Sequence, residues 1–568
     1  MTLSPLDWAV VVASFVASSL VGLVFSRRAG RSVLEYFAAG RSLPWWLSGT
    51  SMVATTFAAD TPLAVTALVA QHGIAGNWVW WNMVAGGMLT VFFYARLWRR
   101  AEVKTDAELT ELRYAGRSAA LLRGFRALYL ALPINLIIIG WVNLAMVKVL
   151  EVTLGLDPFA AMLGIFALTV VYASLSGLWG VVVTDFFQFI LAMFGCVVLA
   201  VYAVDAVGGL DALVAKTPAR SLELFPSDRE WMPVGALLSY LAVQWWASWY
   251  PGSEPGGGGY VAQRIFATRS ERDGMLATLW FTVAHYAVRP WPWILTALAA
   301  AILYPGLADP GVGFVHAIGL LPSGFKGLML AAFAAAYMST LSTQLNWGAS
   351  YLVNDVAARF TRLDEPRLVR LSRWTTAALF LLSTGSTWAL YRLGSVDSAW
   401  RVLIALGAGT GPVYLLRWYW WRVNAWSEIA AMGFSLVSFL VLTVGGVFDP
   451  ADPLDGAWLM VTNTAITTVG WVVVTFLTPP EPLEHLRAFY ARTRPGGWLW
   501  KPVMGEVEPA GGGAAAWLGW GAGVAAVYGA LFGVGRLLLG PRWEAAPWLA
   551  LSVAGFAVVA AVSGKERA

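Results

Sequence analysis

The chain has 568 residues, of which 58% are hydrophobic and only 12% are charged, and its mean hydropathy is +0.64. Soluble domains carry about 25% charged residues, so this composition excludes an ordinary soluble protein. The single cysteine, Cys196, excludes a disulfide framework and a thiolate metal site. Apolar stretches of about 20 residues recur, each long enough to cross a hydrocarbon core about 30 Å thick. The composition therefore predicts an all-α polytopic membrane protein.

Fifteen apolar segments are candidates for membrane spans. Neither of the two longest loops, 207–232 and 479–514, has room for a second folded domain, so a single transmembrane domain over 1–568 is expected. The segments are 6–26, 43–70, 77–98, 121–150, 157–177, 178–206, 233–253, 276–305, 325–353, 368–395, 397–420, 425–447, 458–478, 515–537 and 547–563.

The first segment is read either as a signal peptide or as an uncleaved helix. Its start, MTLSPLD, has no Lys or Arg, and Arg27, Arg28 and Arg31 follow it instead, which favours an uncleaved helix with its N-terminus outside. Alternate loops after it are basic, as the positive-inside rule requires. This pattern places the C-terminus in the cytoplasm and the protein in the cell (inner) membrane, and it explains the net charge of +5 without a nucleic-acid partner. The loop cations are Arg96, Arg99, Arg100, Lys104, Arg264, Arg269, Arg272, Arg359, Arg362, Arg367, Arg370, Arg373, Arg417 and Arg422.

Two of the apolar segments are interrupted in the middle. In 43–70, Pro62 follows Asp60 and Thr61, and proline both removes a backbone donor and disfavours helix at the preceding residue. The stretch WWASWYPGSEPGGGGYVAQR (245–264) contains two prolines and a run of four glycines. Backbone freed at membrane depth is tolerated only where it is buried in protein or lines a wet cavity. Paired breaks in segments of opposite orientation predict the binding site of a secondary transporter, whereas simple packing kinks are the plainer alternative.

A third segment, FAAAYMSTLSTQLN (333–346), carries four serine and threonine hydroxyls in an apolar setting, those of Ser339, Thr340, Ser342 and Thr343. Ala336, Ser339, Thr340 and Thr343 follow the i, i+3, i+4, i+7 spacing and so lie on one face of a helix. Small oxygens in such an arrangement can replace the hydration shell of a cation. Alternatively, each hydroxyl bonds back to its own helix or across to a neighbour.

Four segments resemble the sodium:solute symporter family, and the resemblance covers about residues 1–480. It implies a leucine-transporter-like fold with a five-plus-five inverted repeat. The repeats would span 43–206 and 233–420, with one extra N-terminal helix and about four extra peripheral C-terminal helices in 421–568. The segments are EYFAAGRSLPWW (35–46), VYASLSGLWGVVVTDFFQF (171–189, with Ser176 where the family has a glycine), YVAQRIFATRSERDG (260–274) and AAFAAAYMSTLSTQLN (331–346).

The resemblance implies where one or two sodium ions bind. The family's sodium site uses carbonyls of the broken first core helix and groups of the eighth. Some members have a second sodium site, which uses an aspartate on the fifth helix. A carboxylate within the membrane needs a partner, which supports this second assignment. The first site corresponds here to Ala54, Phe57, Ala336, Ser339 and Thr340, and the second to Asp185, Ser339, Ser342 and Thr343.

The family's solute pocket lies between the broken helices, beside the sodium site. Tyr260 matches an aromatic residue that family members use as an inner gate, whereas Thr61 and the PGSEPGGGG insertion depart from the pattern of the sugar and proline carriers. Three roles are open for Arg289: it binds a carboxylate of the solute, it neutralises Glu254, or its side chain extends to the membrane surface. Acidic residues and tryptophans suit an amine through cation–π contacts, and amides with tryptophans equally suit a sugar. The candidates are Asp60, Thr61, Asn82, Asn143, Gln244, Trp249, Glu254, Tyr260 and Arg289.

These patterns together predict a sodium-coupled symporter that carries a small organic solute into the cell by alternating access. Proton coupling through Asp185 or Asp60 is one alternative. A transporter-like solute sensor is another, although the tail SGKERA (563–568) offers no signalling domain. The sequence has no metal-ligand cluster, nucleophile motif or phosphate loop, so an enzyme is not expected. The expected partners are the solute and the lipid bilayer, with no obligate protein partner.

Overall fold

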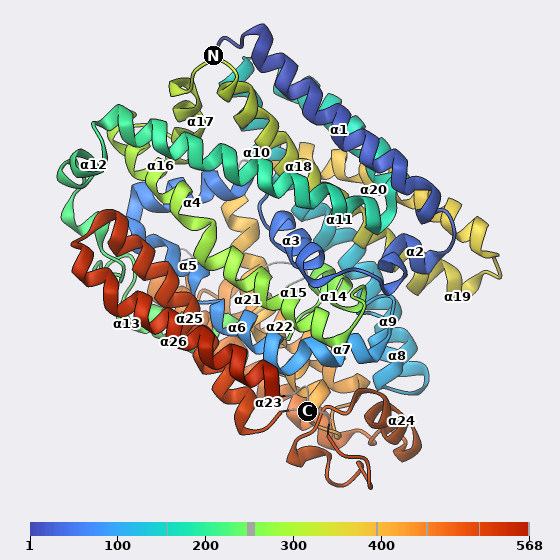
Figure 1. The fold of residues 1–568 in the computed structure, drawn as a ribbon. Coiled ribbons are helices and arrows are strands. Elements are labelled where there is room, and N and C mark those ends of the chain that lie inside the picture. The colour runs from blue at the N-terminus through green and yellow to red at the C-terminus, as the bar shows by residue number, and fades with distance from the viewer. Residues whose placement is uncertain (156, 247–255, 394–395, 450–451, 510–511, 566–568) are drawn as a thin grey trace.

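The computed structural model describes residues 1–568 except 156, 247–255, 394–395, 450–451, 510–511 and 566–568 (Figure 1). Within the described residues the secondary structure is helical apart from one isolated bridge between Leu43 and Thr268, which confirms the all-α prediction. The helices of the first half are α1 (Pro5–Ala29), α2 (Val33–Ala38), α3 (Trp45–Thr55), α4 (Asp60–His72), α5 (Trp78–Trp81), α6 (Val84–Leu89), α7 (Ala95–Ala101), α8 (Leu109–Arg113), α9 (Gly116–Tyr129), α10 (Asn135–Leu154), α11 (Pro158–Val207), α12 (Leu210–Lys216) and α13 (Val234–Ala242).

The second half of the chain is built in the same way, and several of its helices are long. Those of the second half are α14 (Gly259–Phe266), α15 (Glu271–Val283), α16 (Pro290–Leu303), α17 (Gly313–Ala317), α18 (Phe325–Ser350), α19 (Ala358–Phe360), α20 (Glu365–Leu393), α21 (Val396–Tyr419), α22 (Ala425–Val444), α23 (Pro453–Leu477), α24 (Leu483–Thr493), α25 (Ala514–Leu539) and α26 (Arg542–Lys565).

Nine helical stretches of the described chain are long and apolar enough to cross a membrane, and the bent pair α3 and α4 makes a tenth. Each predicted span coincides with helix in its described part, but not every one is a single rod. The span predicted at 77–98 is divided into α5, α6, a π-helical turn and α7. The two predicted at 157–177 and 178–206 are the two helices within α11, which meet at Gly177, where the backbone is not helical. The total of fifteen spans stays a prediction.

Gly177 joins the two parts of α11 because only glycine fits there without strain. Its backbone is left-handed, with φ of 57°, and an added Cβ would lie 2.8 Å from the Cβ of Ala29 and 3.1 Å from the carbonyl oxygen of Tyr36. The bend therefore lets α1 and α2 pack closely against α11.

The broken helix of the first half is the pair α3 and α4, whose axes differ by 59°. The break lies at residues 56–59, directly before Asp60 and Thr61, so Pro62 occupies the first turn of α4, where a missing N–H costs nothing. The counterpart in the second half resumes after the glycine run as α14. The break between α3 and α4 lies at the centre of the bundle, where Thr55 contacts α18.

At that centre lies α18, whose most apolar window is 94% buried. It packs against α1, α3, α10, α11 and α20. Its run of alanines allows this close packing, since small side chains let neighbouring backbones approach. The hydroxyls that follow the alanines are therefore enclosed by protein and do not face lipid.

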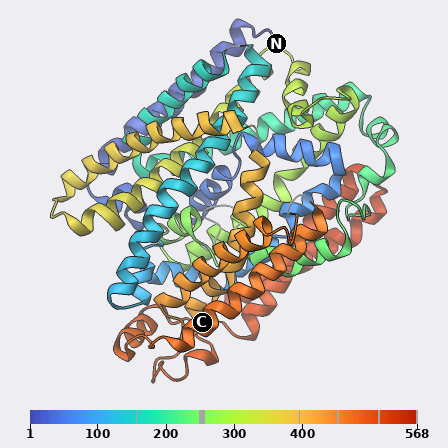
Figure 2. The ribbon, with the colours of Figure 1, turned by 180° about the vertical axis from the view of Figure 1, so that it is seen from behind.

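The two ends of the bundle differ in charge. Helices α2, α8, α19 and α24 lie at one end, while α12 and α17 lie at the other, and both views agree on this (Figures 1 and 2). The first end carries most of the predicted loop cations, including the cluster Arg96–Arg100 at α7 and Arg359 at α19. We call it the basic end.

The last two helices, α25 and α26, form a hairpin that packs against the core. Gly529 and Gly533 let α26 approach closely, because an added Cβ at Gly529 would lie 2.7 Å from the carbonyl oxygen of Trp548. The Tyr528 hydroxyl donates a hydrogen bond to the carbonyl of Trp81 at 2.8 Å, and the Trp291 indole donates to the carbonyl of Leu531 at 2.9 Å. The hairpin therefore contacts the same elements, α5 and α16, that flank the broken helix α4.

Candidate ion and solute sites

The hydroxyls of Ser339, Thr340, Ser342 and Thr343 on α18 are all buried, at 1% exposure or less, and three of them bond to other helices. The Thr340 hydroxyl donates to the carbonyl oxygen of Thr55, the last residue of α3, at 2.9 Å. It also lies 3.2 Å from the carbonyl oxygen of Ala336, one turn earlier in α18. The end of the broken helix is thus held directly against the hydroxyl face of α18.

Ser339 faces a different neighbour. Its hydroxyl donates to Oδ1 of Asp185 on α11 at 2.7 Å, and Asp185 is completely buried. A hydroxyl that donates its proton keeps two lone pairs for a further partner. Ser339 and Thr340 therefore both present oxygen lone pairs at the junction of α3, α11 and α18.

The carboxylate of Asp185 has a buried cation beside it, Arg264 of α14. The Nη2 of Arg264 lies 3.7 Å from Oδ2 of Asp185, and both side chains are fully buried. Ser51 of α3 donates its hydroxyl to the same Oδ2 and accepts from Nε of Arg264 at 3.1 Å. The Nη2 also donates to Oγ1 of Thr343 at 2.6 Å. Asp185 is thus paired within the protein, as a carboxylate in hydrocarbon requires.

Arg264 was expected in a basic loop, and that expectation is wrong. Helix α14 continues to Phe266, so Arg264 lies in its last turn and points inward, with 0% of its side chain exposed. The preceding residue, Gln263, accepts from Nη1 of Arg264 at 2.8 Å and donates to the carbonyl of Phe37 at 3.0 Å. The guanidinium, which presents five donors, therefore ties α14 to α3, α11 and α18.

The remaining hydroxyls divide between the two alternatives raised by the sequence. The Thr343 hydroxyl, besides accepting from Arg264, lies 3.0 Å from the hydroxyl of Thr55. The Ser342 hydroxyl donates to the carbonyl of Ser339 in its own helix at 3.1 Å. The residues predicted for the second sodium site are therefore not all in contact. Asp185 and Ser339 are hydrogen-bonded directly, whereas Thr343 is linked to Asp185 through the guanidinium of Arg264.

Thr56, a half-buried residue at the break, contacts a second group of polar side chains, those of Arg289 and His285. Arg289, at the start of α16, is 1% exposed, and its Nη1 donates to Oγ1 of Thr56 at 3.0 Å. His285 lies between them: its Nδ1 is 3.0 Å from the Thr56 hydroxyl, and its Nε2 is 3.0 Å from Nη2 of Arg289. The guanidinium also sits over the ring of Trp293 at 5.1 Å. Arg289 therefore does not extend to the membrane surface; its charge lies at the break, close enough to act on Asp60.

Comparison with known proteins decides the family. The model of the sodium:solute symporter family matches residues 36–433, which is most of the chain. The chain belongs to the sodium:solute symporter family. The sodium/glucose cotransporter of Vibrio parahaemolyticus is 25% identical over 471 residues, covering 76% of this chain and 84% of its own length. The sodium/sialic acid symporter of Proteus mirabilis is 25% identical, covering 78% and 90%.

Solved structures agree on the fold. A Na+-coupled sialic acid symporter in its substrate-bound outward-open state superposes with a TM-score of 0.69 at 20% identity, over 84% of this chain and 99% of that one. A transporter of the nucleobase-cation-symport-1 family in a closed conformation gives 0.51 at 13% identity, over 80% and 97%. The chain is thus an integral membrane symporter with the leucine-transporter-like fold, and it couples sodium to the movement of a small solute.

In this symporter, two of the expected solute residues meet at one point. The amide nitrogens of Asn82 and Gln244 both donate to the carbonyl of Val79, at 3.0 and 3.1 Å. Their amide oxygens are buried and accept no hydrogen bond from any described residue. A buried acceptor without a donor costs about 1–3 kcal/mol, so this pair is suited to a ligand that supplies donors.

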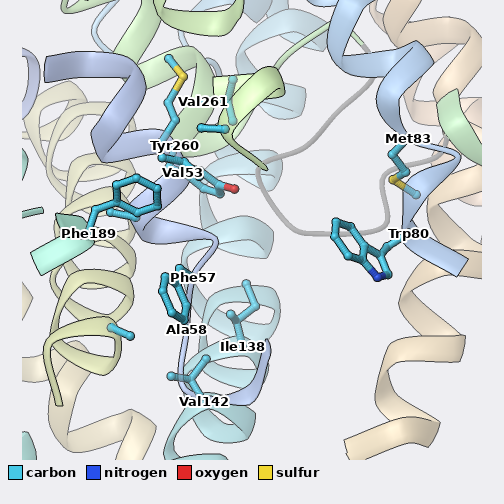
Figure 3. Packing of buried hydrophobic residues seen from close by; sticks show 14 of the residues in the cluster. Val53, Phe57, Ala58, Trp80, Met83, Ile138, Val142, Phe189, Tyr260 and Val261 are labelled. Carbon is cyan, nitrogen blue, oxygen red and sulfur yellow. The ribbon is translucent and has the colours of Figure 1, made fainter. Parts of the chain in front are cut away.

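The other expected solute residues are placed differently. Tyr260 is buried beside Val53, and Phe57 and Ala58 at the break face Ile138 of α10 (Figure 3). Both polar groups of the Asn143 side chain are occupied within the protein: it donates to the Thr387 hydroxyl and accepts from the Tyr337 hydroxyl, each at 2.7 Å. Trp249 and Glu254 lie outside the described residues.

Sequence reasoning missed five polar residues that the symporter brings to these sites. Ser51 and Thr55 occur at a four-residue spacing on α3, a signal present in the sequence. Thr56 is one of the polar residues that interrupt the segment 43–70, but its contact with His285 has no signal in the sequence, because the two meet only in three dimensions. The fifth, Arg264, was assigned to a loop because the predicted span ended at residue 253.

Proposed function

We propose that this symporter carries sodium and a small hydroxylated solute into the cell, with its basic end facing the cytoplasm. The observation that carries the proposal is the hydrogen bond from Thr340 to the carbonyl of Thr55, which holds the broken helix against the hydroxyl face of α18. Alternating access requires a site shared by two parts of the protein that move relative to one another. The excess of loop cations at the basic end supports the orientation, with the N-terminus outside and the C-terminus in the cytoplasm.

The first sodium would bind at this junction. Its ligands would be the carbonyl oxygens of Ala54, Phe57 and Ala336 and the hydroxyls of Ser339 and Thr340. All five residues are at most 4% exposed, so the ion would lose its hydration shell and these oxygens would replace it. Sodium would favour the state in which α3 and α18 stay together, because it contacts both.

A second sodium at Asp185, Ser339, Ser342 and Thr343 would compete with Arg264. The guanidinium already compensates the charge of Asp185 and donates to Thr343. We therefore propose that one sodium is carried while Arg264 is in this position, and that a second can enter only when Arg264 withdraws.

The solute would lie beside the break, near Asp60, Thr61, Tyr260 and Arg289. The oxygens of Asn82 and Gln244 supply acceptors for hydroxyl groups, and Arg289 supplies donors. Relatives named for glucose, sialic acid and myo-inositol support a polyhydroxylated solute. An amine would use the same acceptors and is the alternative to be tested.

The test is a thermal-shift screen of sugars, polyols, amines, amino acids and carboxylates, each in sodium chloride and in potassium chloride. A bound solute raises the unfolding temperature by mass action. We expect a polyol or sugar to stabilise the protein in sodium only. If every solute that binds does so equally in potassium, sodium coupling is refuted. If the shift instead follows pH, the coupling ion is the proton.

A further inference from the structure

The basic end contains a polar pocket that ion and solute transport do not use. Its volume is about 460 Å³, and it lies where α7, the start of α15 and α24 meet. We call it the arginine pocket. Its lining residues are Arg99, Arg100, Glu102, Ser270, Glu271 and Arg492.

The charges in the arginine pocket are unevenly matched. Arg100 is well paired, because its Nε and Nη2 contact the two oxygens of Glu271 at 2.8 and 2.7 Å. Glu102 instead faces three guanidiniums at longer range, those of Arg41, Arg99 and Arg492, at 3.9, 3.8 and 3.9 Å. None of these contacts is at hydrogen-bond distance.

The single carboxylate of Glu102 cannot accept well-directed hydrogen bonds from three arginines at once. Its two oxygens lie in one plane, whereas the three guanidiniums approach from η1 (Ala39–Arg41), α7 and α24. Glu271, the other acid in the lining, is paired with Arg100. Glu108, outside the lining, acts on the charge of Arg41 and accepts from the backbone N–H of Lys104 at 2.7 Å. Even with Glu108 included, three cations face two carboxylates, so positive charge remains in excess.

Arg41, beside the pocket, is affected by both the acids and the arginines. Burial is the main cause that lowers the pKa of the Arg41 guanidinium from its ordinary value; Glu102 and Glu108 act in the opposite direction, and Arg99 and Arg492 add to the lowering. The charges of these five side chains therefore act on one another at this end of the protein.

The backbone around the pocket is strained. In the described chain, four non-glycine residues have positive φ, and three of them, Arg41, Glu102 and Arg494, lie here at 55°, 51° and 47°. Such a conformation is strained for a residue with a side chain and persists only where its surroundings hold it. Strain of this kind is concentrated at binding sites and switch segments.

We propose that the arginine pocket binds a phosphate group, either that of an anionic phospholipid headgroup or that of a soluble phosphate. A tetrahedral phosphate has oxygens pointing in several directions, so it can accept from both Arg99 and Arg492, which line the pocket from different helices. Arg41 lies outside the lining and donates to the carbonyl oxygen of Glu102, so it contributes its charge from beside the pocket. The backbone N–H groups at the start of α15 add a favourable partial charge.

Binding would hold the basic ends of both broken segments together. Residues 41–43 precede α3, and residues 267–269 follow α14. These two segments are already joined, because the backbone N–H of Leu43 donates to the carbonyl of Ala267 and that of Arg269 donates to the carbonyl of Leu43, each at 3.1 Å. Arg99 adds a bond to the carbonyl of Thr268 at 2.8 Å. A phosphate bridging these segments to α24 would favour the state that is closed at the basic end.

The experiment measures the unfolding temperature of the purified full chain in two settings. In detergent, inorganic phosphate is titrated against chloride at matched ionic strength. In nanodiscs, phosphatidylcholine alone is compared with phosphatidylcholine containing phosphatidylglycerol. The variants are Arg492→Gln, Glu102→Gln and the control Arg487→Gln, an exposed cation on α24 outside the pocket.

We expect Arg492→Gln to weaken the response about tenfold or more, since a charge-assisted hydrogen bond is lost. Glu102→Gln should strengthen it, because the competing carboxylate is removed; a purely structural role for Glu102 would not give this gain. A response to phosphate in detergent identifies a soluble ligand, and one confined to phosphatidylglycerol nanodiscs identifies a lipid. Equal responses in all four proteins, or no response to either probe, would overturn the proposal. Stabilisation by sodium is read separately, so failure of the transport proposal would leave this result unaffected.

Discussion

Replacing Thr340 by valine tests the sodium site with almost no change in side-chain volume. The substitution removes one hydroxyl, which donates to the carbonyl of Thr55 at 2.9 Å and would be one of five sodium ligands. Loss of an interaction with a charged partner costs about 1.5–3 kcal/mol, so the dissociation constant for sodium should rise about thirtyfold.

The assay is a titration of the unfolding temperature with sodium chloride at constant ionic strength. At a sodium concentration a hundredfold above the dissociation constant, binding stabilises the wild-type protein by about 2.7 kcal/mol, and a thirtyfold weaker site leaves about 0.9 kcal/mol. The titration curve should therefore shift to higher sodium by about 1.5 decades.

Thr340→Val also removes a hydrogen bond, which lowers the stability without sodium by about 1 kcal/mol. This offset does not move the sodium midpoint, so the two effects are separable. Ser350→Ala is the control, since it removes a buried hydroxyl from the same helix and should leave the midpoint unchanged. If Thr340→Val titrates like the wild type, the proposed site is wrong.

Three further predictions follow from the buried charges. Arg264→Gln should raise the Hill coefficient for sodium from about one toward two, because Asp185 loses its cation and a second sodium can replace it; a coefficient that stays at one speaks against the second site. Arg289→Gln should abolish the solute-induced thermal shift while sodium still stabilises the protein; persistence of the solute shift would remove Arg289 from the solute site. Glu428→Gln should lower the free energy of unfolding by about 3–5 kcal/mol, because the buried Arg126 loses the carboxylate 3.1 Å away; a loss below 1 kcal/mol, as at an exposed pair, would contradict this.

The sequence was sufficient to predict the main features of the ion site. The positions of Ser339, Thr340 and Thr343 follow from the helical period, and the break before Asp60 follows from Pro62. These features depend on residues near one another in the chain, so local rules apply to them.

Features that depend on packing could not be predicted. The positive-inside rule counts a cation by its distance from the end of a span, and it assigned Arg264 to a loop. Its burial depends on α14 restarting after the glycine run and on Asp185 lying opposite. In the same way, Ser342 bonds to its own helix and Ser339 to Asp185, a choice set by which neighbour lies within reach.

The central claim is that a sodium gradient drives solute uptake through the junction of α3 and α18. The most direct measurement is uptake of a radiolabelled solute, taken from the thermal-shift screen, into proteoliposomes with an imposed inward sodium gradient. We predict accumulation above the external concentration for the wild type, which disappears when sodium is equal on both sides and requires more sodium for Thr340→Val. Equal accumulation with and without the gradient would contradict the claim.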